Sequence, residues 1–263
     1  MDKLKELLED KFNRIVIETG FNRDLLVKDY YLTLILFLIK DIKGLYFKGG
    51  TALQKTLIEY SRISEDIDFT LNQPLNKIKK LIITKINNSK LFGKITQDKN
   101  VEGFTRLVVP YKTDLGMDSI FIDLNQRSIL LLKSEQLKMS HFYPNIPQFT
   151  FPCLNKKEMI AEKVAAAIGR NKPRDHYDIY QIIKHNLKID MKLVKKKCKQ
   201  SNQDPSILKM FNKAKKLHKR WDQDMIPLLK DEVSFKEVMQ TLAKYFNLKQ
   251  EKEDLKELTK SDL

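Results

Sequence analysis

The stretch that decides the fold is "FKGGTALQKTLIEYSRISEDIDFTL", residues 47–71. It begins at the end of a short apolar run typical of a strand, passes through two adjacent glycines and continues with helical periodicity. The run "DIDFTL" then alternates polar and apolar side chains, which predicts a strand with Asp66 and Asp68 on one face. The pattern therefore predicts a strand, a glycine turn, a helix and a second strand.

The glycine pair is a candidate phosphate site. Gly49 and Gly50 at a strand-to-helix turn let the backbone approach a ligand closely, and a helix that begins near Thr51 presents N–H groups that favour an anion. An ordinary tight turn explains most such pairs equally well, so this alternative stays open. Arg62 and Ser64, just ahead of the second strand, are candidates for further phosphate or structural contacts.

The two aspartates are a candidate metal site. Carboxylates at i and i+2 on a strand repel each other unless a cation lies between them, and Mg²⁺ or Mn²⁺ suits that position. The alternative is that Asp66 and Asp68 are solvent-facing charges on an edge strand. Asp123, amid the apolar neighbours of "SIFIDLNQR", is a candidate third carboxylate of a two-metal site. Together with the glycine turn, these acids predict phosphoryl or nucleotidyl transfer from a nucleoside triphosphate (NTP).

A second dense motif is "EMIAEKVAAAIGRNKPRDHYDIYQI", residues 158–182. Lys163 could reach a triphosphate, and the alternative is an ordinary surface lysine in a lysine-rich chain. Pro173 predicts the start of a helix on which Asp175 and Asp178 share one face. Acids in a first helical turn also stabilise the helix itself, so a structural role for them stays open.

The chain divides into a mixed first half and a helical second half. We predict an α+β (α/β) protein with a mixed sheet in an N-terminal lobe, residues 1–150, and an all-helical lobe, residues 151–263, joined through the proline-bearing segment 141–154. Apolar periodicity predicts extended stretches near 91–97, 104–111 and 119–124, and helices over 2–14, 24–41, 75–89, 156–169, 174–187, 190–200, 205–220 and 234–247.

The charge of the chain favours a polyanionic partner. Its 263 residues carry a net charge of +15, and residues 184–220 alone hold 13 lysines and arginines against two acids. A basic stripe of this density suits the phosphates of a nucleic acid, whereas the alternative is a solvated lysine surface without a partner.

Cysteine usage and the apolar runs indicate a cytoplasmic protein. Cys153 and Cys198 suggest neither a disulfide framework nor a zinc site. The longest apolar run, residues 30–39, is about half of the roughly 20 residues that a membrane helix needs. We therefore expect no membrane partner, and the charged N-terminus lacks the apolar core of a secretory signal.

The two motifs resemble a known family. "KGGTALQK" and "RISEDIDF", followed by "AEKVAAAIGRNKPRDHYDIY", resemble the AbiEii/AbiGii toxin family of nucleotidyltransferases, related to the MenT toxins, in the DNA polymerase β-like superfamily. The resemblance covers roughly residues 45–185. One departure is the gap of fifteen residues between Gly50 and Asp66, which is longer than is usual in the superfamily.

The resemblance implies roles for the candidate residues and a fold of a nucleotidyltransferase lobe followed by a helical lobe, with the NTP in the cleft between them. In it, Gly49 and Gly50 hold phosphate, and Lys163 contacts the triphosphate. Two Mg²⁺ ions are held by Asp66 and Asp68, with Asp123 as a less constant third ligand. The family's "RDxxD" motif corresponds to Asp175 and Asp178, of which at least one belongs to the site.

The resemblance also implies a biological role. Such enzymes act as toxins that transfer nucleotides from NTP, in known members to the 3′ end of tRNA, and are opposed by a cognate antitoxin. Two rival functions stay open: a metal-dependent nuclease, and a catalytically silent module of the same fold that binds RNA or an antitoxin. NTP dependence separates the three, because only the transferase consumes NTP.

Overall fold

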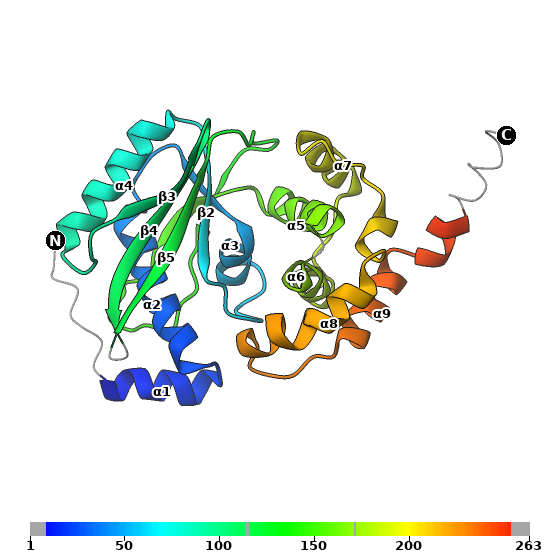
Figure 1. The fold of residues 1–263 in the computed structure, drawn as a ribbon, viewed down its shortest axis with the longest axis horizontal. Coiled ribbons are helices and arrows are strands. Elements are labelled where there is room, and N and C mark those ends of the chain that lie inside the picture. The colour runs from blue at the N-terminus through cyan, green and yellow to red at the C-terminus, as the bar shows by residue number, and fades with distance from the viewer. Residues whose placement is uncertain (1–8, 114–115, 171, 254–263) are drawn as a thin grey trace. The chain divides into compact units, whose positions relative to one another are not determined.

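The computed structural model describes residues 9–113, 116–170 and 172–253, which form two compact units (Figure 1). The first unit comprises residues 1–156 and the second residues 157–263. No helix in the described ranges is long and apolar enough to cross a membrane.

The first unit is built on one seven-stranded sheet with the order β3-β4-β5-β2-β1-β7-β6. The β2–β5 and β1–β7 pairs are parallel and the other pairs are antiparallel, so the sheet is mixed, as predicted. The strands are β1 (Leu45–Lys48), β2 (Asp66–Leu71), β3 (Thr96–Val101), β4 (Phe104–Thr113), β5 (Gly116–Asn125), β6 (Glu135–Lys138) and β7 (Thr150–Cys153).

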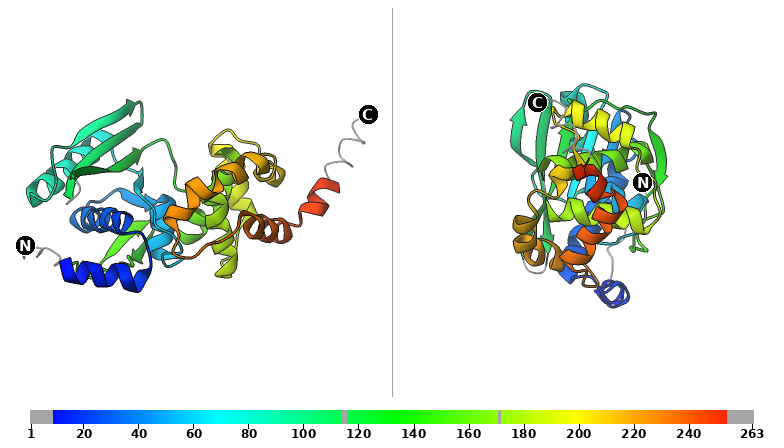
Figure 2. Two further views of the ribbon diagram at one scale, coloured as in Figure 1. Left: turned by 60° about the horizontal axis from the view of Figure 1, so that its bottom comes forward. Right: turned by 90° about the vertical axis from the view of Figure 1, so that its right-hand side faces the viewer.

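The helices of this unit are α1 (Glu9–Thr19), α2 (Arg23–Ile39), α3 (Gly49–Thr56) and α4 (Leu75–Ser89). The side chain of Asn22 caps α2 by accepting hydrogen bonds from the N–H groups of Asp24 and Leu25, at 2.9 and 3.2 Å. Helices α2 and α4 lie against β5 and cover one face of the sheet (Figure 2). The helix predicted over 2–14 is displaced, since α1 runs from Glu9 to Thr19 and residues 2–8 lie outside the described ranges.

Alternation along the strands separates a core face from a polar face. Ile67, Phe69, Ile122 and Leu124 are fully buried. Because the strand period is two residues, the intervening side chains point to the opposite face, where Asp66, Asp68 and Asp123 are half-buried. The candidate carboxylates therefore belong to the face that α2 and α4 do not cover.

Two strands that the sequence did not indicate, β6 and β7, form one edge of the sheet. β6 was not predicted, and β7 lies in the segment 141–154 that we expected to be only a connection. β7 runs parallel to β1 with Phe47 opposite Cys153, and the Leu154 N–H donates to the Phe47 carbonyl at 3.0 Å. Pro152 hides the strand signal, because proline removes a ladder donor. β3 also begins later than the stretch predicted near 91–97.

The second unit is helical, and its described residues contain no strand. The single helix predicted over 205–220 is wrong, because a 3₁₀ turn, Ile207–Met210, precedes α8. The Met210 carbonyl accepts a hydrogen bond from His176 Nε2 at 2.9 Å, so it does not continue a helical ladder. The helices are α5 (Lys156–Arg170), α6 (Pro173–Lys184), α7 (Met191–Gln200), α8 (Ala214–Met225) and α9 (Phe235–Tyr245).

Candidate active site

The glycine turn lies directly against the candidate metal and phosphate ligands. Gly49 has a φ of 79°, and a Cβ built there would collide with the carboxylate of Asp68. A Cβ on Gly50 would lie 2.9 Å from Arg62 Nη2 and 3.0 Å from Ser64 Oγ. Gly49 therefore excludes a side chain through both its φ and the position of Asp68, whereas a Cβ on Gly50 would only have to displace the ends of two side chains.

The N-terminus of α3 has no side-chain cap from its N-cap residue, Lys48, within the described ranges. The Thr51 hydroxyl instead donates to the Asp66 carbonyl at 2.5 Å, which fixes α3 against β2. Arg62 is buried, and its Nη1 donates to the Ile63 carbonyl at 2.8 Å. The first N–H groups of α3 and the positive end of its dipole thus lie beside the strand carboxylates.

The sheet register brings the three predicted aspartates onto one face. Asp68 lies opposite Asp123 in the parallel β2–β5 pair and opposite Lys48 in the β1–β2 pair. Asp66 lies two residues earlier on the same face of β2. β2 lies between β5 and β1, so the alternative that these acids stand on an edge strand is wrong.

Asp123 has a partner that the sequence did not reveal. Arg106 of β4 forms a two-pronged ion pair with it, with Nε at 2.6 Å from Oδ1 and Nη2 at 2.7 Å from Oδ2. The hydrogen bond to Asp123 raises the pKa of Arg106 further above its ordinary value. Arg106 and Asp123 are 17 positions apart, so only the β4–β5 register brings them together.

Asp66 and Asp68 fit a divalent cation. Mg²⁺ is commonly held by one or two carboxylates together with the phosphate oxygens of its substrate, and these side chains lie beside the N-terminus of α3. No group of three or more His, Cys, Asp or Glu side chains in the described ranges is arranged to hold a metal. Asp66 and Asp68 thus offer two carboxylates to a cation, and the phosphate oxygens of a bound triphosphate would supply further ligands.

The predicted residues of the second unit form one buried ionic cluster. Lys163 Nζ lies 3.2 Å from Asp175 Oδ1 and 2.8 Å from Asp178 Oδ2, and Arg170 Nε lies 2.7 Å from Asp175 Oδ2. Burial alone would raise the pKa of Asp175, but Lys163 and then Arg170 outweigh it and hold that pKa well below its usual range. Lys163 is 6% exposed, so the alternative of an ordinary surface lysine is wrong.

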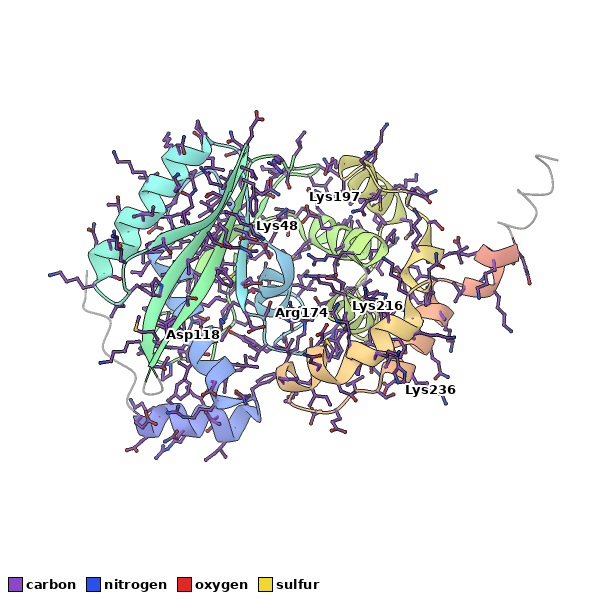
Figure 3. All side chains as sticks on the ribbon, in the orientation of Figure 1. Lys48, Asp118, Arg174, Lys197, Lys216 and Lys236 are labelled. Carbon is purple, nitrogen blue, oxygen red and sulfur yellow. The ribbon has the colours of Figure 1, made fainter. Side chains whose placement is uncertain are left out.

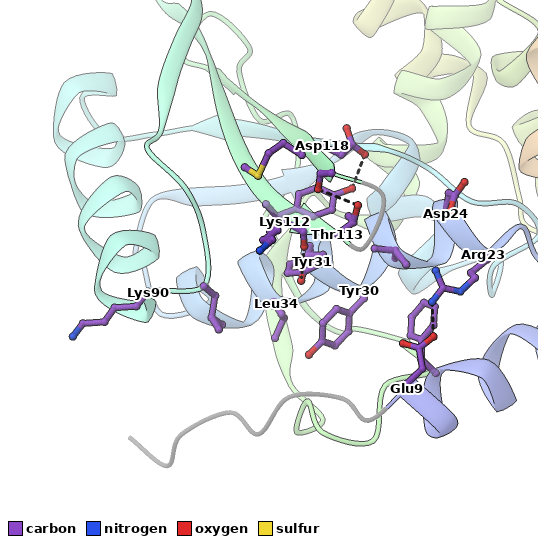
Figure 4. Close-up of a pocket in the computed structure, with 16 residues that line it drawn as sticks. Glu9, Arg23, Asp24, Tyr30, Tyr31, Leu34, Lys90, Lys112, Thr113 and Asp118 are labelled. Carbon is purple, nitrogen blue, oxygen red and sulfur yellow. Dashed lines mark hydrogen bonds and ion pairs between the residues drawn. The ribbon is translucent and has the colours of Figure 1, made fainter.

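A pocket of about 670 Å³ lies elsewhere in the first unit (Figure 4). Its described lining comes from α1, α2, the end of α4 and the β4–β5 hairpin, and includes none of the predicted site residues. One of the acids in its wall, Asp118, is already paired, since it accepts a hydrogen bond from the Tyr111 hydroxyl at 2.6 Å and lies 3.6 Å from Lys28. This pocket is therefore not where the candidate chemistry lies.

A mixed sheet with paired carboxylates beside a helix N-terminus is an arrangement suited to nucleotidyl transfer. The comparisons with known proteins agree with this class and narrow it to a family. The sequence profile described as "Nucleotidyl transferase AbiEii toxin, Type IV TA system" matches residues 37–244. The chain therefore belongs to the AbiEii family of nucleotidyltransferase toxins.

Solved structures share the fold. MenT4, a nucleotidyltransferase toxin from Mycobacterium tuberculosis, is 21% identical with a TM-score of 0.60, over 90% of this chain and 99% of that one. JHP933 from Helicobacter pylori is 18% identical with a TM-score of 0.60, over 92% of this chain and 100% of that one. No curated protein sequence matches the chain.

Proposed function

We propose that this nucleotidyltransferase transfers a nucleoside monophosphate from an NTP to a hydroxyl group of RNA, at the 3′ end of a tRNA, using Mg²⁺ or Mn²⁺ held by Asp66 and Asp68. The observation that carries the proposal is the contact of Gly49 with Asp68, which joins a phosphate-binding turn to a cation-binding strand. Membership of the AbiEii family supports the transfer reaction and a cognate antitoxin as partner.

In this reaction, the acceptor hydroxyl oxygen forms a bond to the α-phosphorus and the bond to pyrophosphate breaks. The hydroxyl proton is released as the oxygen attacks. The N–H groups at the start of α3 bind phosphate oxygens, and Asp66 and Asp68 orient the cation. A bound divalent cation supplies positive charge for the phosphate oxygens, which lowers the cost of charge that builds up on the leaving group.

The helical unit supports RNA as the acceptor. Helix α7 exposes four lysines, whereas its Lys197 is buried and ion-paired with Glu158 and Glu162 of α5 (Figure 3). The pairing fixes α7 on α5 and leaves the other lysines available to phosphates. The exposed lysines of α7 are Lys192, Lys195, Lys196 and Lys199.

The buried cluster of the second unit has a positioning role in the proposal. Lys163 and Arg170 balance the charges of Asp175 and Asp178, and these ion pairs hold α5 against α6. Their assignment to the reacting site remains a proposal carried by the resemblance of the "RDHYD" motif. Thr51, Arg62 and Ser64 are likewise proposed to shape the phosphate-binding turn rather than to react.

The test is transfer of label from each NTP in turn to total tRNA, with Mg²⁺. We expect one or two NTPs to label RNA, and Asp66→Asn/Asp68→Asn to reduce the rate by about 100-fold or more, because charge stabilisation is removed. Asp118→Asn removes a carboxylate from β5 outside the site and should retain activity. RNA cleavage without NTP would establish the nuclease instead, and salt-dependent binding without transfer or cleavage would establish the silent module.

A further inference from the structure

The acidic face of the sheet already contains cationic side chains, of which Lys48 lies opposite Asp68. Arg106 lies opposite Asp123 in the β4–β5 register, and Asp123 lies opposite Asp68 in the β2–β5 register. The guanidinium is therefore only two strands away from the strand that carries the candidate metal ligands. The Arg106 guanidinium is paired with the carboxylate of Asp123, which a two-metal site would need as its third ligand.

The ion pair has the geometry of a fixed pair rather than a transient surface contact. Both carboxylate oxygens of Asp123 are engaged, at 2.6 and 2.7 Å, and the two side chains are only 14% and 23% exposed. The Arg106 guanidinium also lies 5.1 Å from the centre of the Phe121 ring. A planar fork bound at two points and stacked on an aromatic ring is pre-organised, so it is displaced less readily than a lysine.

The guanidinium keeps donors for a second acceptor. Arginine has five N–H groups, and the pair with Asp123 uses one on Nε and one on Nη2. The remaining donors suit a phosphate oxygen, which arginine recognises in the same planar geometry as a carboxylate. A metal ion on Asp123 would have to share the carboxylate oxygens with these two hydrogen bonds, and it would stand close to the positive charge of Arg106.

We propose that Arg106 takes the place of a second metal ion, so that the site binds one divalent cation, on Asp66 and Asp68. Asp123 positions Arg106 and is not a metal ligand, and Arg106 contributes the second positive charge toward the substrate phosphates. This inference rests on the proposed function only where it names a substrate phosphate as the ligand of Arg106. The number of cations that the site binds can be counted whatever reaction the protein catalyses.

The test counts Mn²⁺ bound to the full chain by electron paramagnetic resonance, without nucleotide. We expect one ion per chain in the wild type and one in Asp123→Asn. Arg106→Gln frees the carboxylate of Asp123, so we expect it to bind two. The double variant Arg106→Gln/Asp123→Asn should return to one, and Asp66→Asn/Asp68→Asn should bind none.

Two ions in the wild type, falling to one in Asp123→Asn, would overturn the proposal, as would a wild type that binds none. The comparison of wild type with Asp123→Asn decides the matter even if Arg106→Gln unfolds, because asparagine still accepts a hydrogen bond from Arg106. The transfer of label from NTP to tRNA tests the proposed function independently of the Mn²⁺ count. One bound ion without any nucleotide transfer refutes the proposed function and leaves the ion count standing, whereas transfer with two bound ions refutes only this inference.

Discussion

Position 49 excludes a side chain for two separate reasons. Its φ of 79° is in the left-handed region, and its Cα faces the carboxylate of Asp68 at a distance that leaves no room for a Cβ. The first reason concerns the stability of the turn, and the second concerns the place of a candidate metal ligand. A substitution at Gly49 should therefore affect folding and function by different amounts.

We predict that Gly49→Ala lowers the free energy of unfolding by about 1–2 kcal/mol, the usual cost of a left-handed alanine. It should also reduce Mn²⁺ affinity and nucleotide transfer by about tenfold or more, because the Asp68 carboxylate must move. Gly116→Ala is the matched control, since Gly116 has a φ of 128° but no described atom within 4 Å of its Cβ position. Equal reductions of Mn²⁺ affinity in the two variants would contradict this account.

The candidate site was predictable from sequence to the extent that its residues are neighbours in sequence. Gly49, Asp66 and Asp68 fall within one short strand–helix–strand unit, so their spacing alone indicates a common place. Arg106 gives no such signal, because its link to Asp123 depends on which strands pair and in what register. The same register gives Asp123, which the sequence made a candidate metal ligand, its partner Arg106.

At the scale of elements, α7 is the helix of the basic stripe (residues 184–220) whose exposed charges are all positive. Its exposed lysines recur at i, i+3, i+4 and i+7, so they form one row, while Leu193, Val194 and Cys198 face the core. No residue of α7 is acidic, and like charges at these spacings repel each other. A row of phosphates would relieve this repulsion.

We predict that replacing Lys192, Lys195, Lys196 and Lys199 by glutamine weakens tRNA binding and flattens its dependence on salt. For single-stranded RNA the log–log slope should fall by about 0.7 for each phosphate that the variant no longer neutralises. The slope is measured by filter binding over a series of salt concentrations. The matched control replaces four lysines of α4, which do not form one row: Lys77, Lys79, Lys80 and Lys85. A control whose slope falls as much would show that total charge, not α7, determines binding.

Elements with long regular periodicity were predictable, and elements defined by a tertiary partner were not. α2, α4 and α5 carry enough apolar repeats to indicate a helix on their own. β7 has four residues including Pro152 and is a strand because β1 lies beside it. The interruption before α8 depends on His176, a residue of another helix.

At the scale of the whole molecule, a chain with a net charge of +15 encloses ion pairs in each unit. In the first unit, Lys55 and Asp29 are fully buried and lie 2.8 Å apart, and burial lowers the pKa of Lys55 although Asp29 partly opposes this. In the second unit, Lys163 and Lys197 are buried with acidic partners. Removing one partner of such a pair leaves an uncompensated charge in the core.

We predict that the second unit loses stability as the pH falls below about 4, because the folded-state pKa of Asp175 is lowered from 3.8. Between the two pKa values the unfolded chain binds more protons than the folded chain, so acid favours unfolding. Asp175→Asn should cost about 3 kcal/mol at pH 7, and the difference from the wild type should shrink in acid. Fluorescence of Trp221, the single tryptophan, reports urea unfolding of this unit.

Asp222→Asn, which removes an exposed carboxylate from α8, serves as the control and should follow the wild type throughout. If the difference between Asp175→Asn and the wild type persisted unchanged at pH 3, protonation of Asp175 would not be the source of the acid sensitivity.

The parallel pairing of β7 with β1 determines where this chain can be cut. A fragment that ended before residue 150 would lack β7, and Leu45–Lys48 would become an open sheet edge next to the strand that carries the carboxylates. Unprotected edges recruit strands from other molecules, so such a fragment would be prone to aggregate during expression. Isolation of the carboxylate-bearing unit in soluble form therefore requires the chain to continue at least through Cys153, where β7 ends.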